Sequence, residues 1–175
     1  MSTALDEIIN DLAAEQAALA RVLDDLSAGD WDVPTHGPGW SVRDQVSHLA
    51  YFDEAAARAM VDPEAFAAEV REFVQAGPEA EAGYLARGRD MAPGGVLDWW
   101  RTASSALIAA ARTLDPNARV PWFGPAMSAA SFITARLMET WSHGLDVVDV
   151  VGAGRPDTDR LRHVVFLGVR TRAYS

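Results

Sequence analysis

The sequence contains no cysteine and no lysine, and it has no long hydrophobic run. The absence of cysteine excludes disulfides, thiolate metal ligands and a cysteine nucleophile, so any sulfur chemistry must come from a bound molecule. All 15 basic residues are arginine, which excludes Schiff-base chemistry on a lysine. No hydrophobic segment approaches the roughly 20 residues of a transmembrane helix, and the amino-terminal MSTALDEIIND is too acidic for a signal peptide. We therefore expect a cytoplasmic protein that does not bind membranes.

Acidic residues outnumber basic ones, and the formal net charge is -10. This charge argues against nucleic acid as a partner, because neutralising phosphates supplies most of the affinity in such complexes. A length of 175 residues suits one domain and is enough to bury a core without disulfides. We expect a single domain over residues 1–175.

Apolar residues recur at helical spacing through most of the chain, and no segment alternates as a β-strand does. The segment 120–123, VPWF, is the only strand candidate and is too short. Residues 30–40 are rich in Pro, Gly and Trp and are expected to be a non-helical loop, after which Ser41 is a good N-cap. The pattern predicts an all-α fold, a four-helix bundle with additional short helices. The long helices are expected at 3–28, 41–61, 95–114 and 127–151, and the shorter ones at 63–77, at 79–91 and from a cap at Asp157 or Thr158 to Tyr174.

The segment Ser131 to Val151 carries both an apolar stripe and a line of polar residues. Arg136, Glu139, His143 and Asp146 fall within an arc of roughly 80° at helical spacing. Glu139 and His143 are one turn apart, so a carboxylate oxygen and an imidazole nitrogen can converge on one metal ion. They could equally be an ordinary solvated pair. The apolar stripe consists of Ile133, Leu137, Trp141, Leu145 and Val148.

A third ligand has to come from another helix, and His48 on the segment 41–61 is the candidate. If the two helices face each other, His48, Glu139 and His143 form a set of nitrogen and oxygen ligands with a position left for water or substrate. Asp44 and Asp146 are spaced to accept the other ring N–H of each histidine, as carboxylates behind metal ligands often do. Both could also be plain surface acids.

The strings GWSVRDQVSHLAYFD (39–53) and ARLMETWSHGLDVVD (135–149) resemble the DinB-like superfamily, and within it the mycothiol-dependent maleylpyruvate isomerase family. The resemblance covers essentially the whole chain as the amino-terminal metal-binding domain of that family. It implies a DinB-like four-helix bundle, often dimeric, that binds a divalent ion through His48, Glu139 and His143. Zinc is the expected ion, with nickel or another divalent ion as alternatives.

The relatives that isomerise maleylpyruvate are longer and have a second, carboxy-terminal domain that contributes to the pocket. We expect this chain to lack that domain. It is then either a shortened form or a protein with a different pocket wall, so the substrate stays open.

The resemblance also implies thiol chemistry, since a divalent ion lowers the pKa of a bound thiol and the thiolate is the nucleophile. Without cysteine in the chain, the thiol would be mycothiol, acting on an electrophilic small molecule as an isomerase or an S-transferase. Arg87 or Arg89 is a candidate to hold substrate carboxylates, because a guanidinium matches a carboxylate bidentately. Trp40 and Trp122 are candidates for the pocket entrance, although aromatic residues at such junctions commonly serve packing.

Two other functions fit the same residues. The first is a metal-dependent hydrolase in which the ion activates water and the general base is Asp44 or His36. The second is a metal-stabilised bundle that serves binding or assembly without catalysis.

Overall fold

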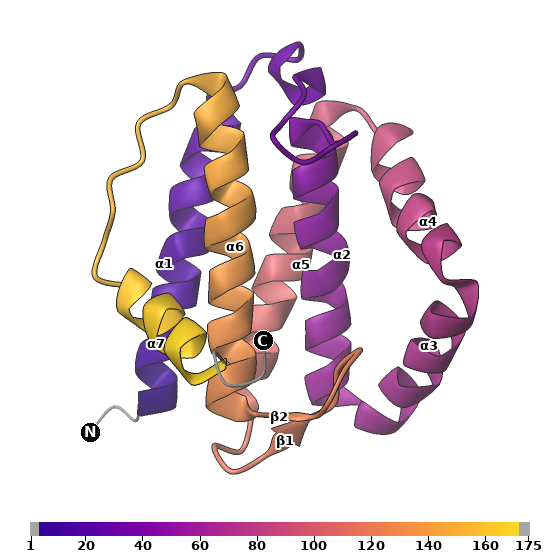
Figure 1. Cartoon of the computed structure of the whole chain (residues 1–175), viewed down its shortest axis with the longest axis vertical. Coiled ribbons are helices and arrows are strands. Elements are labelled where there is room, and N and C mark those ends of the chain that lie inside the picture. Colours follow the sequence, from indigo (N-terminus) through magenta and orange to yellow (C-terminus); the bar gives the residue numbers. More distant parts are fainter. Residues whose placement is uncertain (1–3, 172–175) are drawn as a thin grey trace.

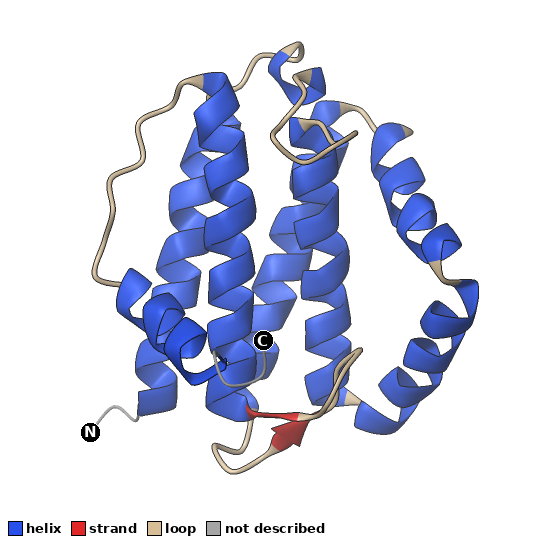
Figure 2. Cartoon of the chain, viewed as in Figure 1, coloured by secondary structure: helices blue, strands red, loops and turns tan. Residues whose placement is uncertain are grey.

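The chain folds into an all-α bundle, seen here in a computed structural model that describes residues 4–171 (Figures 1 and 2). The four longest helices, α1, α2, α5 and α6, run side by side and form the bundle. Within it, α2 packs against α5 and α6, and α1 packs against α6 and α5. The described helices are α1 (Ala4–Asp24), α2 (Val42–Val61), α3 (Pro63–Ala76), α4 (Pro78–Arg89), α5 (Pro93–Thr113), α6 (Ala129–Val151) and α7 (Leu161–Thr171).

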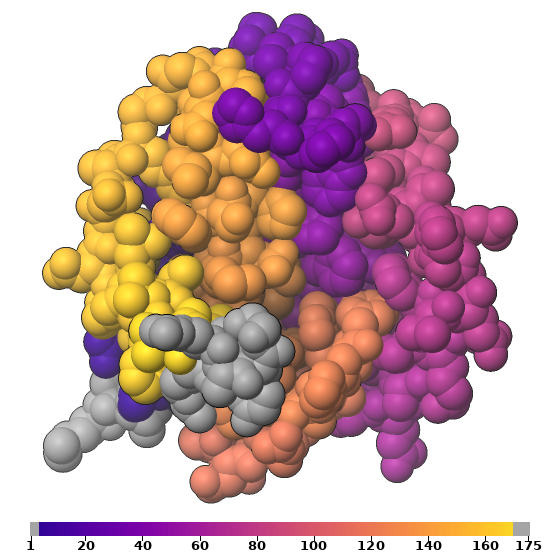
Figure 3. All heavy atoms as spheres, in the orientation of Figure 1, coloured from indigo at the N-terminus to yellow at the C-terminus, as the bar shows by residue number. Residues whose placement is uncertain are grey.

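The shorter helices lie outside the bundle on two sides. Helices α3 and α4 run along the outside of α2, and α7 lies against α6 on the opposite side (Figure 1). In the space-filling view, α2 is set back between α6 and α4 (Figure 3). The outer helices therefore flank α2 on one side and α6 on the other.

The helix ends follow local sequence signals. Ser41 caps α2 by accepting a hydrogen bond from the Asp44 backbone N–H, and Asp44 returns the contact to the Ser41 backbone in a capping box. Helix α3 begins at Pro63 after the cap Asp62 and ends at Ala76, with Gly77 as its C-cap, whose φ of 56° suits glycine. The predicted helices at 41–61, 63–77, 79–91 and 95–114 are thus confirmed to within a few residues.

Several predicted boundaries are wrong. The first helix ends at Asp24 instead of residue 28, and Asp30–Asp32 forms a 3₁₀ turn within the predicted loop. Residues Arg119–Val120 (β1) pair antiparallel with Met127–Ser128 (β2), so α6 begins at Ala129 and not at 127. The last helix begins at Leu161 and not after a cap at 157 or 158. Its predicted extension to Tyr174, like the predicted start at Thr3, lies outside the described residues.

The apolar stripe predicted on α6 is only partly in the core. Ile133, Leu137 and Val148 are buried, whereas Trp141 is half-buried and Leu145 is 38% exposed. Trp141 and Leu145 face the segment that contains Arg155 and Pro156 instead of the bundle interior.

Two apolar clusters fill the bundle, one at each end, and polar side chains lie between them. Leu12, Phe66 and Phe132 belong to one cluster, and Leu19, Leu49 and Trp100 to the other. At the level between them, the fully buried Asp53 carboxylate accepts hydrogen bonds from the Arg136 guanidinium at 2.8 and 3.2 Å. The two residues join α2 to α6 at the height of the candidate site.

Helix α7 and the segment before it are held to α1 by charged contacts. The Glu15 carboxylate, buried on α1, contacts Arg155 and lies 2.7 Å from the Arg160 guanidinium. Asp11 contacts both Arg162 and His163, at 2.9 and 3.0 Å. These pairs fix the position of α7 beside α6.

Candidate metal centre

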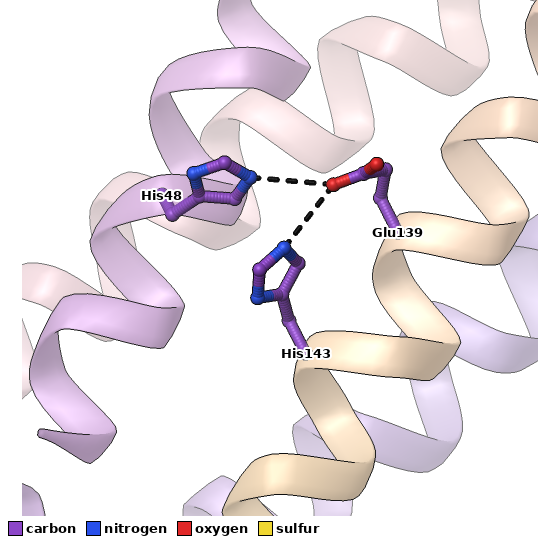
Figure 4. A group of neighbouring side chains, drawn as sticks. All are labelled: His48, Glu139 and His143. Carbon is purple, nitrogen blue, oxygen red and sulfur yellow. Dashed lines mark hydrogen bonds and ion pairs between the residues drawn. The ribbon is translucent and has the colours of Figure 1, made fainter. Parts of the chain in front are cut away.

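Three side chains from two helices meet at one point. His48 reaches it from α2, and Glu139 and His143 reach it from α6 (Figure 4). One carboxylate oxygen of Glu139 lies 3.3 Å from His48 Nε2 and 3.1 Å from His143 Nε2. The three ligand atoms all lie within 4.8 Å of one another. The structure therefore brings together the three residues that the sequence predicts as ligands.

The site is partly withdrawn from solvent, which changes how its groups ionise. Burial, with the nearby charges of His143 and Arg136, lowers the pKa of His48 to about 4 despite its contact with Glu139. Burial alone would raise the pKa of Glu139, but the contacts with His143 and His48 and the charge of Arg136 hold it well below its ordinary value. At neutral pH the centre thus has a neutral His48 and an ionised Glu139, the forms in which these residues bind metals.

Gln45 sets the orientation of His143. Its side-chain nitrogen donates to Asp146 at 3.1 Å and to the Thr35 hydroxyl at 2.9 Å, so its side-chain oxygen faces Nδ1 of His143. A carboxylate can only accept, so Asp146 determines which end of the Gln45 amide points toward the histidine. Because the amide oxygen also accepts, Nδ1 of His143 must carry a proton.

This orientation leaves Nε2 of His143 directed at the Glu139 carboxylate. If Nδ1 carries the only ring proton, a lone pair on Nε2 faces a carboxylate oxygen at 3.1 Å, and two acceptors repel. Either a second proton on His143 or a cation shared by the three ligand atoms removes the conflict. Two imidazoles and a carboxylate with an open side are the donor set that zinc takes in catalytic sites. The residues present therefore fit a divalent metal ion.

His48 is oriented by Tyr84 and not by Asp44. Its Nδ1 lies 3.2 Å from the Tyr84 hydroxyl on α4. Burial raises the pKa of Tyr84, so the phenol keeps its proton at neutral pH. Asp44 instead accepts from Ser41 and, at 2.8 and 3.1 Å, from the Arg89 guanidinium. The prediction that Asp44 supports His48 is wrong, because the capping box and the ion pair occupy its carboxylate.

Asp146 stands behind His143 as predicted, but indirectly. The expected contact between the Asp146 carboxylate and the imidazole is replaced by the Gln45 side chain, which touches both. Gln45 and Tyr84 are the two functional residues that sequence reasoning missed. The position of Gln45, three residues before His48 on the same helix, was a usable signal. No local pattern marked Tyr84.

The two candidate arginines are both engaged. Arg87 lies 3.4 Å from Glu54 and stacks over the Trp99 ring at 3.9 Å. Arg89 is held by Asp44, with a further hydrogen bond to the Gly39 carbonyl. Both guanidiniums already pair with carboxylates of α2, and their role in holding a substrate carboxylate stays a prediction.

Of the two candidate tryptophans, one lies at the centre. The Trp40 ring stacks on His143 with centroids 5.9 Å apart and lies 5.3 Å from His48. Trp122 packs at the other end of an aromatic cluster, against Phe66 and Phe132, and is separated from His48 by Phe52. Phe52 itself contacts the His48 ring at 4.6 Å. Trp40 and Phe52 thus form the aromatic wall, and Trp122 belongs to the packing behind it.

A second group of potential ligands lies on the surface between α1 and α7. Glu7, Asp11 and His163 also bring three ligand atoms within 4.8 Å. The Arg162 guanidinium contacts both carboxylates there. In that group a guanidinium already occupies the carboxylates, whereas no arginine forms an ion pair with Glu139 in the described part of the chain.

The fold and the site together define a class of protein. It is an all-α bundle of DinB-like architecture with a His, Glu, His cluster between two of its helices. Residues 12–148 match the family described as the mycothiol maleylpyruvate isomerase N-terminal domain, and the chain belongs to that family. Among the described helices, none combines the length and apolar character that crossing a bilayer requires.

The chain is also similar to two curated proteins and to solved structures. Two uncharacterized proteins from two strains of Mycobacterium tuberculosis are each 40% identical over 171 residues, covering 95% of this chain. The chain spans 65% of the length of these relatives. The crystal structure of the mycothiol-dependent maleylpyruvate isomerase superposes with a TM-score of 0.73 at 18% identity, over 95% of this chain and 70% of that one. A histidine-to-alanine mutant of that enzyme matches equally well, at 17% identity. At these identities the solved structures establish the fold alone.

Proposed function

We propose that this chain is the metal-binding domain of a thiol-using enzyme, a mycothiol-dependent isomerase or S-transferase, with His48, Glu139 and His143 as the ligands. The proposal rests mainly on the orientation of His143. Gln45 and Asp146 direct its Nε2 atom at the Glu139 carboxylate, and the Nε2 to Oε2 distance is 3.1 Å. A divalent ion, zinc by the donor set, would lower the pKa of a bound thiol and keep it as thiolate near neutral pH. The family description and the name of the solved relative support mycothiol as that thiol.

The residues of the chain would prepare the reaction in separate ways. Gln45 and Tyr84 orient the two imidazoles from behind. Trp40 and Phe52 shield the centre from water, which strengthens electrostatic interactions there. The chain has no cysteine, so the nucleophilic sulfur has to arrive with the cosubstrate.

The reaction would begin with addition of the thiolate sulfur to one carbon of an activated cis double bond. A C–S bond forms, and the electron pair of the double bond moves onto the neighbouring carbonyl oxygen as an enolate. In an isomerase the remaining single bond rotates and the thiolate leaves, restoring the double bond in the trans form. In a transferase the enolate takes up a proton from solvent and the thioether is kept.

Hydrolysis receives less support from this site. Asp44, one of the two candidate general bases, is buried under Arg89 and Ser41, and its pKa lies below the ordinary value despite the opposing effect of burial. A weaker base close to a guanidinium is poorly placed to activate water. Dimerisation and a cytoplasmic location stay predictions.

A thermal-shift experiment with zinc and mycothiol tests the proposal. Protein stripped by a chelator is measured alone, with zinc, and with zinc plus millimolar mycothiol. We expect zinc to raise the melting temperature, and mycothiol to raise it further only when zinc is present, because a ligand of the folded state stabilises by mass action.

The matched variants are Glu139→Gln at the centre and Glu69→Gln on α3, a half-buried carboxylate away from the centre that pairs with Arg58. Glu139→Gln should lose both shifts, and Glu69→Gln should keep them. No shift with millimolar thiol on zinc-loaded protein would contradict the thiol chemistry. A zinc shift of equal size in Glu139→Gln would contradict the ligand set.

A further inference from the structure

The four bundle helices form two pairs, and the candidate centre lies across the boundary between them. Helix α6 packs chiefly against α1, and α2 packs chiefly against α5, whereas α2 and α6 contact each other less extensively (Figure 1). His48 belongs to the α2–α5 pair, and Glu139 and His143 belong to the α1–α6 pair. The distances between the ligand atoms therefore depend on how one helix pair is placed along the other.

A buried ion pair crosses this boundary close to the centre. Asp53 on α2 accepts hydrogen bonds from Nε and Nη2 of Arg136 on α6, both at the same carboxylate oxygen, at 3.2 and 2.8 Å. The other carboxylate oxygen of Asp53 lies 3.5 Å from Nε2 of Gln16 on α1. All three side chains are buried. Asp53 of the α2–α5 pair is thus bound to both helices of the α1–α6 pair.

The ion pair lies next to the ligands along both helices. His48 is about one and a half turns before Asp53 on α2, and Glu139 is about one turn after Arg136 on α6. Because a helix moves as a rigid rod over so few turns, sliding Arg136 along Asp53 would move Glu139 past His48 by the same distance. Nε2 of His48 and Oε2 of Glu139 are 3.3 Å apart, so a shift of about 1 Å would already spoil a shared ligand geometry.

Stability of the fold does not account for this ion pair. Burial raises the pKa of Asp53 despite the adjacent Arg136 guanidinium, so the contact does not fully offset the cost of removing the carboxylate from water. Replacing both members of such a pair by apolar residues is commonly neutral or stabilising. What the pair supplies is direction, because a planar guanidinium binds a carboxylate in a defined geometry, whereas apolar contacts are non-directional.

We propose that Asp53 and Arg136 are positioning residues, which hold the α2–α5 pair in register with the α1–α6 pair so that the ligands of the centre meet. This inference deepens the proposed function and rests on it for the ion, but not for the geometry. The two residues act through the helices that carry the ligands. Together they have no net charge, so removing both changes the geometry of the centre without changing the net charge near it.

The first test replaces both partners at once, in the variant Asp53→Leu/Arg136→Met. The matched control is Asp24→Leu/Arg101→Met, because Asp24 on α1 and Arg101 on α5 form an ion pair across the same boundary, at 2.6 Å, but exposed and on α1 and α5 instead of α2 and α6. The Asp53→Leu/Arg136→Met variant should melt at or above the wild-type temperature and bind zinc about tenfold or more weakly, measured by chelator competition. The control should bind zinc as the wild type does.

A cross-linking rate measures the same geometry without a metal. The substitutions His48→Cys/Glu139→Cys place two thiols at the centre, and the sequence has no other cysteine. In chelator-stripped protein, dibromobimane should bridge these thiols about fivefold or more slowly once Asp53→Leu/Arg136→Met is added, and at an unchanged rate once the control pair is added. Intact mass separates the bridged product from protein alkylated at each thiol separately.

The inference is overturned if Asp53→Leu/Arg136→Met leaves the cross-linking rate unchanged, or if this variant and a zinc-binding wild type have equal zinc affinities. Should the variant melt well below the wild type, Arg136→Lys decides instead, because it keeps the charge but not the planar guanidinium. An unchanged cross-linking rate in Arg136→Lys would then overturn the inference.

The same measurements separate this inference from the proposed function. A wild-type protein that binds no zinc would refute the proposed function, and the metal-free cross-linking rates would still decide the role of Asp53 and Arg136. A wild-type protein that binds zinc and mycothiol, with equal cross-linking rates in all backgrounds, would do the reverse.

Discussion

The side-chain amide of Gln45 determines which nitrogen of His143 carries a proton. Asp146 and Thr35 accept from its nitrogen, and its oxygen faces His143 Nδ1. Residues in this position behind a metal ligand commonly matter for affinity nearly as much as the ligand itself. In this chain the position is filled by the neutral amide of Gln45. The Asp146 carboxylate fixes the orientation of that amide, and the amide in turn orients His143.

We expect Gln45→Ala to weaken zinc binding by about 10- to 100-fold, because the imidazole loses both its orientation and its proton acceptor. Zinc affinity of the purified variant is measured by chelator competition. Gln75→Ala, on the exposed surface of α3, removes the same amide away from the site and should bind zinc as the wild type does. Equal affinities for the wild type and Gln45→Ala would show that Gln45 does not orient His143.

Residue spacing made the three candidate ligands predictable. The residues that orient them from behind could not be predicted in this way. Glu139 and His143 are adjacent through helix geometry alone, and His48 followed from two facing helices. Asp44 was assigned by spacing to His48, although the Ser41 to Asp44 capping-box pattern gives it a competing local use. Tyr84 comes from an outer helix whose position depends on tertiary packing, which one sequence does not encode locally.

At the scale of elements, the close approach of α4 to α2 depends on Gly88. A Cβ atom built there would lie 1.8 Å from Ser47 Oγ and 2.7 Å from Ser47 Cβ. Ser47 directly precedes His48, and Tyr84 lies one turn before Gly88 on α4. The glycine therefore sets the distance at which Tyr84 reaches the His48 ring.

Gly88→Ala should destabilise the fold by about 1–3 kcal/mol, because α4 has to move away from α2. Gly83→Ala on the same helix meets no atom within 4 Å and should stabilise by roughly 0.5–1 kcal/mol through helix propensity. Urea unfolding of both variants gives the two free energies. If the two substitutions had effects of the same sign, the proposed packing of α4 on α2 would be wrong.

Helices were more predictable than the short connections between them. Caps and prolines at Ser41, Asp62 and Pro63 mark where α2 and α3 begin. The two-residue strands β1 and β2 are too short to show an alternation, and they exist because residues 119–128 fold back across the end of the bundle. The exposure of Leu145 was also not predictable, because its neighbour in space is the irregular segment that carries Arg155. That segment covers Leu145 less completely than a bundle helix would.

At the scale of the whole molecule, the centre links stability to pH. The pKa of His48 is about 4 in the folded protein against an ordinary value of 6.5, so the unfolded chain takes up this proton first as the pH falls. Stability should therefore decrease from about pH 6.5 down to about pH 4, and it should recover as the pH rises. The lowered pKa of Glu139 acts in the same direction below its ordinary value of 4.5.

For chelator-stripped protein, we expect His48 to contribute a loss of about 2 kcal/mol between pH 7 and pH 5. The His48→Gln variant should lack this part of the loss, so its free energy of unfolding should depend less on pH. Urea unfolding at both pH values measures the difference between wild type and variant. Parallel pH dependences in the two proteins would mean that His48 does not titrate abnormally in the folded state.

The charge pattern of the molecule also separates its two groups of potential ligands. Arg162 contacts the carboxylates of both Glu7 and Asp11, whereas no arginine touches the three ligand atoms on α2 and α6 in the described part of the chain. An added ion should accordingly choose the centre of His48, Glu139 and His143.

Anomalous diffraction at the zinc edge from crystals of zinc-loaded protein tests this most directly. We predict one peak per chain, about 2.0–2.2 Å from Nε2 of His48, Nε2 of His143 and a carboxylate oxygen of Glu139. A peak at Glu7, Asp11 and His163 with none at this centre, or no ordered zinc at all, would contradict the account.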